Sequence, residues 1–150
     1  MNGLKVSYVS SEFIDYLYDL FEKNNRWVEH NITTNCYLTD NQIGFIPDHF
    51  KKEIHEDIND MHWLHILKFP PEGKLDWHTH YEFEKISYVL YMDDVGGTFF
   101  KINGEEVFVK SERCKLILFP SEYEHKAETY DRIRYVSAGG ITSVSPHNNS

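Results

Sequence analysis

Cysteine is scarce in this chain of 150 residues, which contains only Cys36 and Cys114. The two lie far apart in the sequence and form no CxxC pair, so the pattern favours neither a disulfide framework nor a thiolate metal site. We therefore expect two reduced thiols that are buried as small hydrophobic side chains.

Long apolar runs are also missing. Nowhere does the chain sustain the roughly 18 consecutive apolar residues that cross a membrane as a helix. The opening residues, MNGLKVSYVSSEF, contain no basic stretch followed by an apolar run, which is the pattern of a secretory signal. The sequence therefore predicts a soluble cytoplasmic protein without a membrane partner.

Positive charge is in deficit, since 15 Lys and Arg residues stand against 24 Asp and Glu residues and give a net charge of −9. Such a chain repels a phosphate backbone, so nucleic acid is not an expected partner. The length suits one domain over residues 1–150, and the sequence shows no internal repeat. We predict a helical support over residues 1–62, a β core over 63–142 and a disordered tail over 143–150. The oligomeric state is not indicated.

The first third of the chain has helical periodicity. A helix is predicted to begin after Ser10 or Ser11, which are both good N-caps, and to end at Asn24-Asn25. Its apolar face consists of Phe13, Ile14, Leu17, Leu20 and Phe21. A second helix is predicted to open at Pro47, with a buried stripe at four-residue steps formed by Ile46, Phe50, Ile54 and Ile58.

Short strands dominate the rest of the chain. An extended segment is expected over residues 26–40, between the two helices. Further runs rich in β-branched and aromatic residues lie at 63–69, 75–80, 86–92, 97–102, 105–110, 115–119 and 132–138. Asn103-Gly104 supplies the two positive-φ positions of a type I′ turn and predicts a hairpin. These elements favour a mainly β domain of the α+β class, a sandwich or barrel with the helices on one outer face.

Two histidines stand two residues apart in KLDWHTH, at positions 78 and 80. Side chains alternate along a strand, so Asp76, His78 and His80 are predicted to share one face, with Trp77 on the other. Imidazole is the commonest ligand for transition metals, and this pair would supply two neighbouring coordination positions. A third ligand should then come from another strand that faces the same interior.

His125 is the candidate for that third ligand. It follows the buried run LILF and a turn that begins at Pro120, which delivers it to the next strand. The remaining histidines are expected to be surface or packing residues. The sequence thus predicts a metal site formed by His78, His80 and His125.

The region from Leu67 to Ile141 resembles the core of the iron(II)- and 2-oxoglutarate-dependent oxygenases, in particular the prolyl 4-hydroxylase-like branch. The resemblance rests on HTH, on YVLYMDDVGGTFF and on LILFPSEYEHKAETYDRIRYVSAGG, taken in that order and at those spacings. It implies a double-stranded β-helix, a jelly-roll or cupin-like barrel. It also implies an oxygenase that uses Fe(II) and 2-oxoglutarate, with no catalytic residue beyond the metal ligands.

The resemblance also assigns the co-substrate site. Arg134 lies nine positions after His125, where the family carries a basic residue that binds the far carboxylate of 2-oxoglutarate. Arg134 and Val136 are predicted to share the inner face of their strand, and Arg132 lies on the same face as an alternative. Tyr88 is a candidate to lend its hydroxyl to the co-substrate, or else fills the barrel. The substrate is expected to be a small molecule or a peptide.

Two positions depart from the family pattern. His80 replaces the usual carboxylate ligand, so the implied ligand set is three neutral imidazoles, and a dianionic co-substrate would have to offset the charge of the metal. Phe69 stands where relatives often carry a tyrosine whose hydroxyl contacts 2-oxoglutarate.

Two alternatives remain open. His78, His80 and Glu84, with Pro120 and His125 further on, are similar to the two metal motifs of cupins, although the cupin glycines are poorly kept. In a cupin Glu84 would bind the metal and no buried cation would be needed at position 134. The chain could also be a binding barrel that has lost catalysis.

Overall fold

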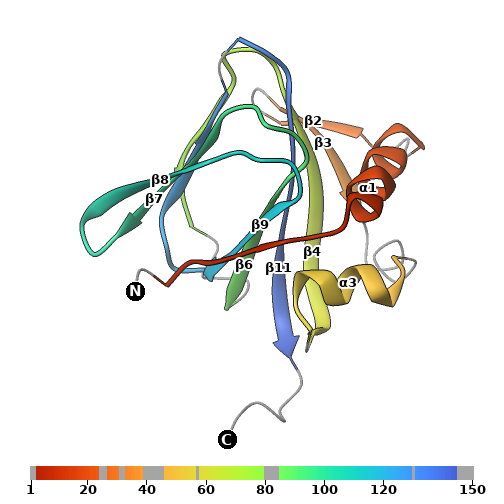
Figure 1. Ribbon diagram of the computed structural model, residues 1–150. Coiled ribbons are helices and arrows are strands. Elements are labelled where there is room, and N and C mark those ends of the chain that lie inside the picture. The colour runs from red at the N-terminus through yellow and green to blue at the C-terminus, as the bar shows by residue number, and fades with distance from the viewer. Residues whose placement is uncertain are drawn as a thin grey trace, which may run out of the picture.

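The structure, a computed structural model, describes two β-sheets and two helices (Figure 1). The described residues are 3–23, 27–30, 33–38, 46–56, 58–79, 85–129 and 131–144. No helix within these ranges is both long enough and apolar enough to cross a membrane.

From α1 onward the elements follow one another in the order that the sequence predicts, whereas β1, which precedes α1, was not predicted. The helices are α1 (Ser11–Lys23) and α3 (Asp48–Ile54), and the strands are β1 (Lys5–Tyr8), β2 (Trp27–His30), β3 (Thr33–Leu38), β4 (Ile58–Phe69), β5 (Lys74–His78), β6 (Ile86–Tyr91), β7 (Gly97–Ile102), β8 (Glu105–Lys110), β9 (Lys115–Pro120), β10 (His125–Glu128) and β11 (Arg134–Val144).

The strands form a large sheet in the order β1-β9-β6-β11-β4-β3-β2 and a small sheet in the order β5-β10-β7-β8. From β4 to β11 the chain passes back and forth between the two sheets, and all neighbouring strands are antiparallel. This winding is a double-stranded β-helix, so the predicted fold is confirmed.

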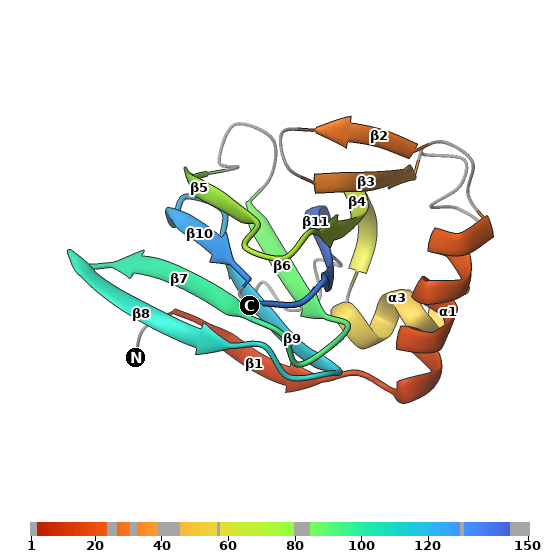
Figure 2. The ribbon, with the colours of Figure 1, turned by 90° about the horizontal axis from the view of Figure 1, so that it is seen from above.

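Strand β6, which lies within the large sheet, is buried on both faces, whereas β1 at the edge is exposed. One face of the large sheet packs against α1 and α3, and the other faces the small sheet (Figure 2). The helix-side core includes Phe13 and Leu17 of α1 together with Leu90 of β6. The core between the sheets, which we call the inner core, consists of Leu67, Phe69, Val89, Tyr91, Phe100, Ile102, Ile117, Phe119 and Val136.

The first helix agrees with its prediction and the second is shorter than predicted. The Phe13 amide donates to the Ser10 hydroxyl at 3.2 Å, so Ser10 caps α1 as expected. The second helix ends at Ile54 because His55 has extended backbone angles, and Ile58 begins β4. The four-residue spacing of Ile58 was therefore misleading, since an apolar strand residue can continue a helical stripe by chance.

The hairpin prediction is confirmed, because Asn103 and Gly104 have φ angles of 52° and 81° between the paired residues Ile102 and Glu105. The N-terminal region supplies β1, β2 and β3 to the large sheet as well as the two helices. At the other end β11 continues to Val144, and the rest of the predicted tail, 145–150, lies outside the described residues.

Candidate metal and co-substrate site

Two of the three predicted metal ligands lie side by side on neighbouring strands of the small sheet. His78 ends β5 and His125 begins β10, and the two residues are directly paired in the antiparallel register. Their ring centroids lie 4.2 Å apart. His80 lies outside the described residues, and within the described part of the chain no three His, Cys, Asp or Glu side chains form a metal-binding group.

A β-bulge sets which side chains of β5 face inward. His125 pairs with His78 and Ala127 pairs with Leu75, so Lys126 alone opposes two residues of β5. Because of the extra residue, Leu75 and His78 both face the inner core. The prediction that Asp76 shares the face of His78 was therefore wrong, since strict alternation does not continue through a bulge.

Both imidazoles donate through the same ring nitrogen. His78 Nδ1 lies 2.7 Å from the Asp76 carbonyl oxygen, and His125 Nδ1 lies 3.1 Å from the Tyr123 carbonyl oxygen. A carbonyl can only accept, so Nδ1 carries the proton in each ring and Nε2 is the nitrogen with a lone pair. Metal-binding histidines usually hold this arrangement, in which a second hydrogen bond orients the ring.

The surroundings of the pair favour neutral imidazoles. His125 is 5% exposed and packs against Phe119, with ring centroids 4.9 Å apart, and against Phe100, at 6.0 Å. Burial lowers the pKa of the His78 imidazole below its ordinary value, and contacts with Asp76 only partly oppose the shift. Neutral imidazole is the form that binds a metal, so these residues suit a metal site.

The inner core also contains a buried cation. Arg134, at the start of β11, is 1% exposed, and its Nε and Nη1 atoms have no hydrogen-bond partner among the described residues. The guanidinium carbon lies 5.1 Å from the Phe69 ring centroid and 5.6 Å from that of Tyr91. Burial lowers the pKa of Arg134, although Tyr91 and Asp93 oppose the shift. Arginine nevertheless stays charged in proteins, and a buried charge without a partner is costly.

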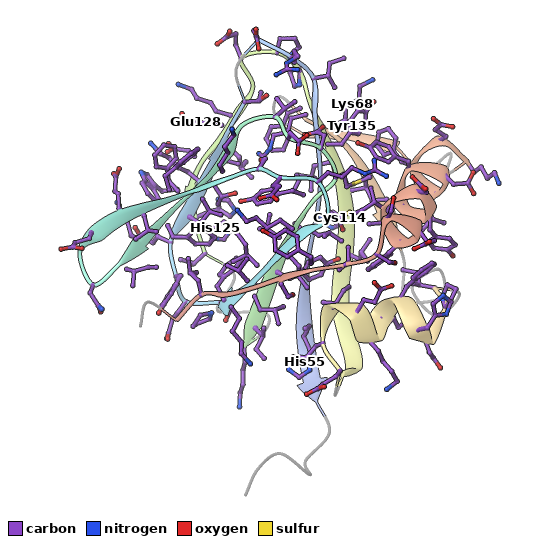
Figure 3. All side chains as sticks on the ribbon, in the orientation of Figure 1. His55, Lys68, Cys114, His125, Glu128 and Tyr135 are labelled. Atoms are coloured by element: carbon purple, nitrogen blue, oxygen red, sulfur yellow. The ribbon has the colours of Figure 1, made fainter. Side chains whose placement is uncertain are left out.

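Strand alternation at β11 follows the prediction. Val136 lies in the inner core with the two rings that flank Arg134, whereas Tyr135 packs edge-on against Tyr18 of α1 with ring centroids 5.2 Å apart. Figure 3 shows Tyr135 and Lys68 beside α1 and His125 on the side of the small sheet. Arg132 is exposed and precedes β11, so it does not take the place of Arg134.

A carboxylate fixes the start of β11. Asp93, just beyond β6, accepts from the Tyr135 amide at 2.7 Å and from the Val95 amide at 3.0 Å. The backbone next to Arg134 is thereby tied to the turn that follows β6. The sequence alone does not predict this contact, because nothing in the local pattern shows which amide a turn aspartate will meet.

Tyr88 is not placed to contact a co-substrate beside Arg134. It belongs to the helix-side core, and its hydroxyl lies 3.2 Å from the Ser137 hydroxyl. Tyr91, three residues later on β6, faces the inner core instead and donates to the Thr98 hydroxyl at 2.8 Å. Tyr88 thus lies on the helix side of β6, whereas Tyr91 lies on the side of Arg134.

The sequence and the structure were compared with those of known proteins. No model of a protein family matches the sequence, and no curated protein matches it. A prolyl-4-hydroxylase from Pseudomonas putida superposes with a TM-score of 0.72 at 15% identity, over 97% of this chain and 95% of that one. The structure matches those of 2-oxoglutarate oxygenases along nearly its whole length.

This is the fold of the 2-oxoglutarate-dependent iron(II) oxygenases. HygX from Streptomyces hygroscopicus, with nickel and 2-oxoglutarate bound, has the oxygenase fold at a TM-score of 0.71 and 9% identity, over 92% of this chain and 82% of that one. A prolyl hydroxylase from Trichoplax adhaerens, in complex with a hypoxia inducible factor peptide fragment, gives 0.67 at 11% identity, over 94% and 84%. Identities this low establish the oxygenase fold alone.

Proposed function

We propose that the protein is an oxygenase that depends on iron(II) and 2-oxoglutarate. The observation that carries this proposal is the buried guanidinium of Arg134, whose Nε and Nη1 have no hydrogen-bond partner among the described residues and which shares a core with the His78 and His125 pair. A native fold rarely leaves such a group unsatisfied unless it serves a ligand. A carboxylate of the co-substrate is a suitable partner, because it can accept two parallel hydrogen bonds from a guanidinium.

His78 and His125 would hold the metal, with His80 as the proposed third ligand. The described residues fit this role through their adjacent rings, their Nδ1 hydrogen bonds and their apolar surroundings. Bound iron(II) together with 2-oxoglutarate and dioxygen would supply the oxidation of an otherwise unreactive substrate C–H bond, with dioxygen as the oxidant and succinate and carbon dioxide as co-products. The three imidazoles add no negative charge, so the dianionic co-substrate would balance the metal.

The inner core would orient the co-substrate and exclude water. Phe69 and Tyr91 flank the guanidinium, and the Tyr91 hydroxyl is held by Thr98. In a dry site of this kind, the attraction between guanidinium and carboxylate is screened much less than in water. We propose a small molecule or a peptide as the substrate, in keeping with the peptide complex of the Trichoplax relative.

The proposal is tested by titrating the purified metal-free protein without oxygen. Isothermal calorimetry should show one Fe(II) site per chain and then, only in the presence of metal, one 2-oxoglutarate site. After air is admitted, the loaded protein should convert 2-oxoglutarate to succinate even without a known substrate. Metal binding without 2-oxoglutarate binding would favour a cupin-type metalloenzyme, and binding of neither would favour a barrel that has lost catalysis.

Substitution of Glu84 by glutamine is expected to leave metal affinity unchanged. In the oxygenase proposal this residue is not a ligand, whereas a cupin site would require its carboxylate. Glu84 lies outside the described residues. Cobalt(II) titrations of the parent and of Glu84→Gln would be compared, with His78→Ala as the variant that loses binding. A large loss of cobalt(II) affinity in Glu84→Gln would favour a cupin site over the proposed oxygenase site.

A further inference from the structure

The bulge of β5 places the backbone carbonyl of Asp76 beside the ring of His78, the candidate metal ligand two residues later. Asp76 and Trp77 are the two residues that Lys126 opposes on β10. The Asp76 carbonyl accepts from His78 Nδ1 at 2.7 Å, and the Asp76 carboxylate accepts from the Trp77 amide at 2.8 Å. One residue thus contacts the ring of the candidate ligand and also satisfies an amide within the bulge.

The second residue of the bulge, Trp77, contacts two lysine side chains on the outer face of the small sheet. The Trp77 ring lies under two ammonium groups, Lys101 Nζ at 4.3 Å from the ring centroid and Lys126 Nζ at 5.1 Å. These lysines come from β7 and β10, the neighbouring strands of the small sheet. An ammonium group within about 6 Å of the centroid of an aromatic ring is attracted to the face of that ring. The outer face of the small sheet therefore anchors Trp77 while the inner face presents His78.

We propose that Asp76 is the positioning residue for His78. Its carboxylate stabilises the bulge by accepting the Trp77 amide, and the bulge in turn aims the Asp76 carbonyl at Nδ1, which fixes the ring orientation and leaves the lone pair on Nε2. The inference rests on the proposed function and adds to it the residue that sets the orientation and tautomer of His78. Asp76 itself touches neither metal nor substrate in this proposal.

The test compares Asp76→Ala with Asp76→Asn. Alanine removes the acceptor for the Trp77 amide, whereas the asparagine side-chain oxygen can still accept that hydrogen bond. Loss of a residue that orients a ligand typically lowers metal affinity about 10- to 100-fold. We expect a decrease of this size for cobalt(II) in Asp76→Ala, measured by calorimetry, and an affinity close to that of the parent in Asp76→Asn.

A second readout needs no metal. Nitrogen-15 chemical shifts of the imidazoles in the metal-free protein should show His78 protonated at Nδ1 in the parent and in Asp76→Asn. In Asp76→Ala they should show a mixture of tautomers. His125 serves as an internal reference, because its Nδ1 contacts the Tyr123 carbonyl and should not change.

The matched control is Asp94→Ala. Asp94 is likewise exposed, and its carboxylate accepts a backbone amide, that of Arg113, at the same distance of 2.8 Å. This control should alter neither cobalt affinity nor the His78 tautomer. An unchanged His78 tautomer in Asp76→Ala, or an equal loss in Asp94→Ala, would overturn the inference. A parent that binds no metal would refute the proposed function, while the tautomer measurement would still decide the role of Asp76.

Discussion

Replacing His125 by alanine is expected to abolish metal binding at any practical concentration. The residue supplies one of the three proposed ligands, and its ring centroid lies 4.2 Å from that of His78. Loss of a ligand should lower affinity by more than the roughly 10- to 100-fold that loss of a ligand's hydrogen-bond partner costs. Calorimetric titration with iron(II) or cobalt(II) measures the effect directly.

The control for this variant must separate lost ligation from lost packing. His125 is 5% exposed and contacts Phe119, so alanine would also leave a cavity and cost some stability. His78→Ala should show the same loss of metal with less loss of stability, because His78 is only half-buried. The exposed His49, replaced by alanine, should bind like the parent. If both His78→Ala and His125→Ala still bind one metal with parental affinity, the site lies elsewhere.

Replacing Arg134 by methionine is expected to abolish 2-oxoglutarate binding and to leave metal binding nearly intact. Removing one partner of a buried, hydrogen-bonded charge pair costs about 2–5 kcal/mol, or at least about 30-fold in Kd. Metal should still bind because its proposed ligands lie on β5 and β10 and on the residues that follow β5, whereas Arg134 lies on β11. Calorimetry of the metal-loaded variant with 2-oxoglutarate gives the comparison.

The stability of Arg134→Met shows whether the variant still folds. Methionine removes a buried cation whose Nε and Nη1 lack hydrogen-bond partners in the described chain, so the metal-free variant should unfold at no lower urea concentration than the parent. Arg132→Met, at an exposed position, should bind 2-oxoglutarate normally. Saturating 2-oxoglutarate at about 100 times its Kd should stabilise the loaded parent by about 2.7 kcal/mol and the Arg134 variant hardly at all. Parental binding by Arg134→Met would refute the co-substrate assignment.

Local patterns were sufficient to predict most of the fold. The apolar face of α1, its Ser10 cap and the Asn103-Gly104 turn each depend on residues close together in the chain, and each was confirmed. The proximity of His78 and His125 was also predicted, from strand alternation and from the turn at Pro120 that precedes His125. Contacts that depend on the register between distant strands carry no such local signal.

Two differences between expectation and structure near the candidate site have that origin. Both faces of β6 are buried, so hydrophobicity along the strand does not show which face is turned toward the small sheet. The sequence therefore did not show that Tyr91, rather than Tyr88, lies beside Arg134; that contact follows from the pairing of β6 with β11. The bulge in β5 is a property of its pairing with β10, and the sequence of β5 alone predicts regular alternation.

The position of β5 in its sheet has a consequence for how metal would enter and leave. Among the described strands β5 is at the edge of the small sheet, hydrogen-bonded to β10 alone, whereas β6 and β11 lie within the large sheet, which the helices cover on one face. An edge strand can detach at a lower free-energy cost than the rest of a barrel. We expect amide exchange in β5 to be faster than in β6 and β11, and to slow when a metal links His78 to His125. The rate of metal binding would then depend on how often β5 detaches from β10, while the strands around Arg134 keep their hydrogen bonds.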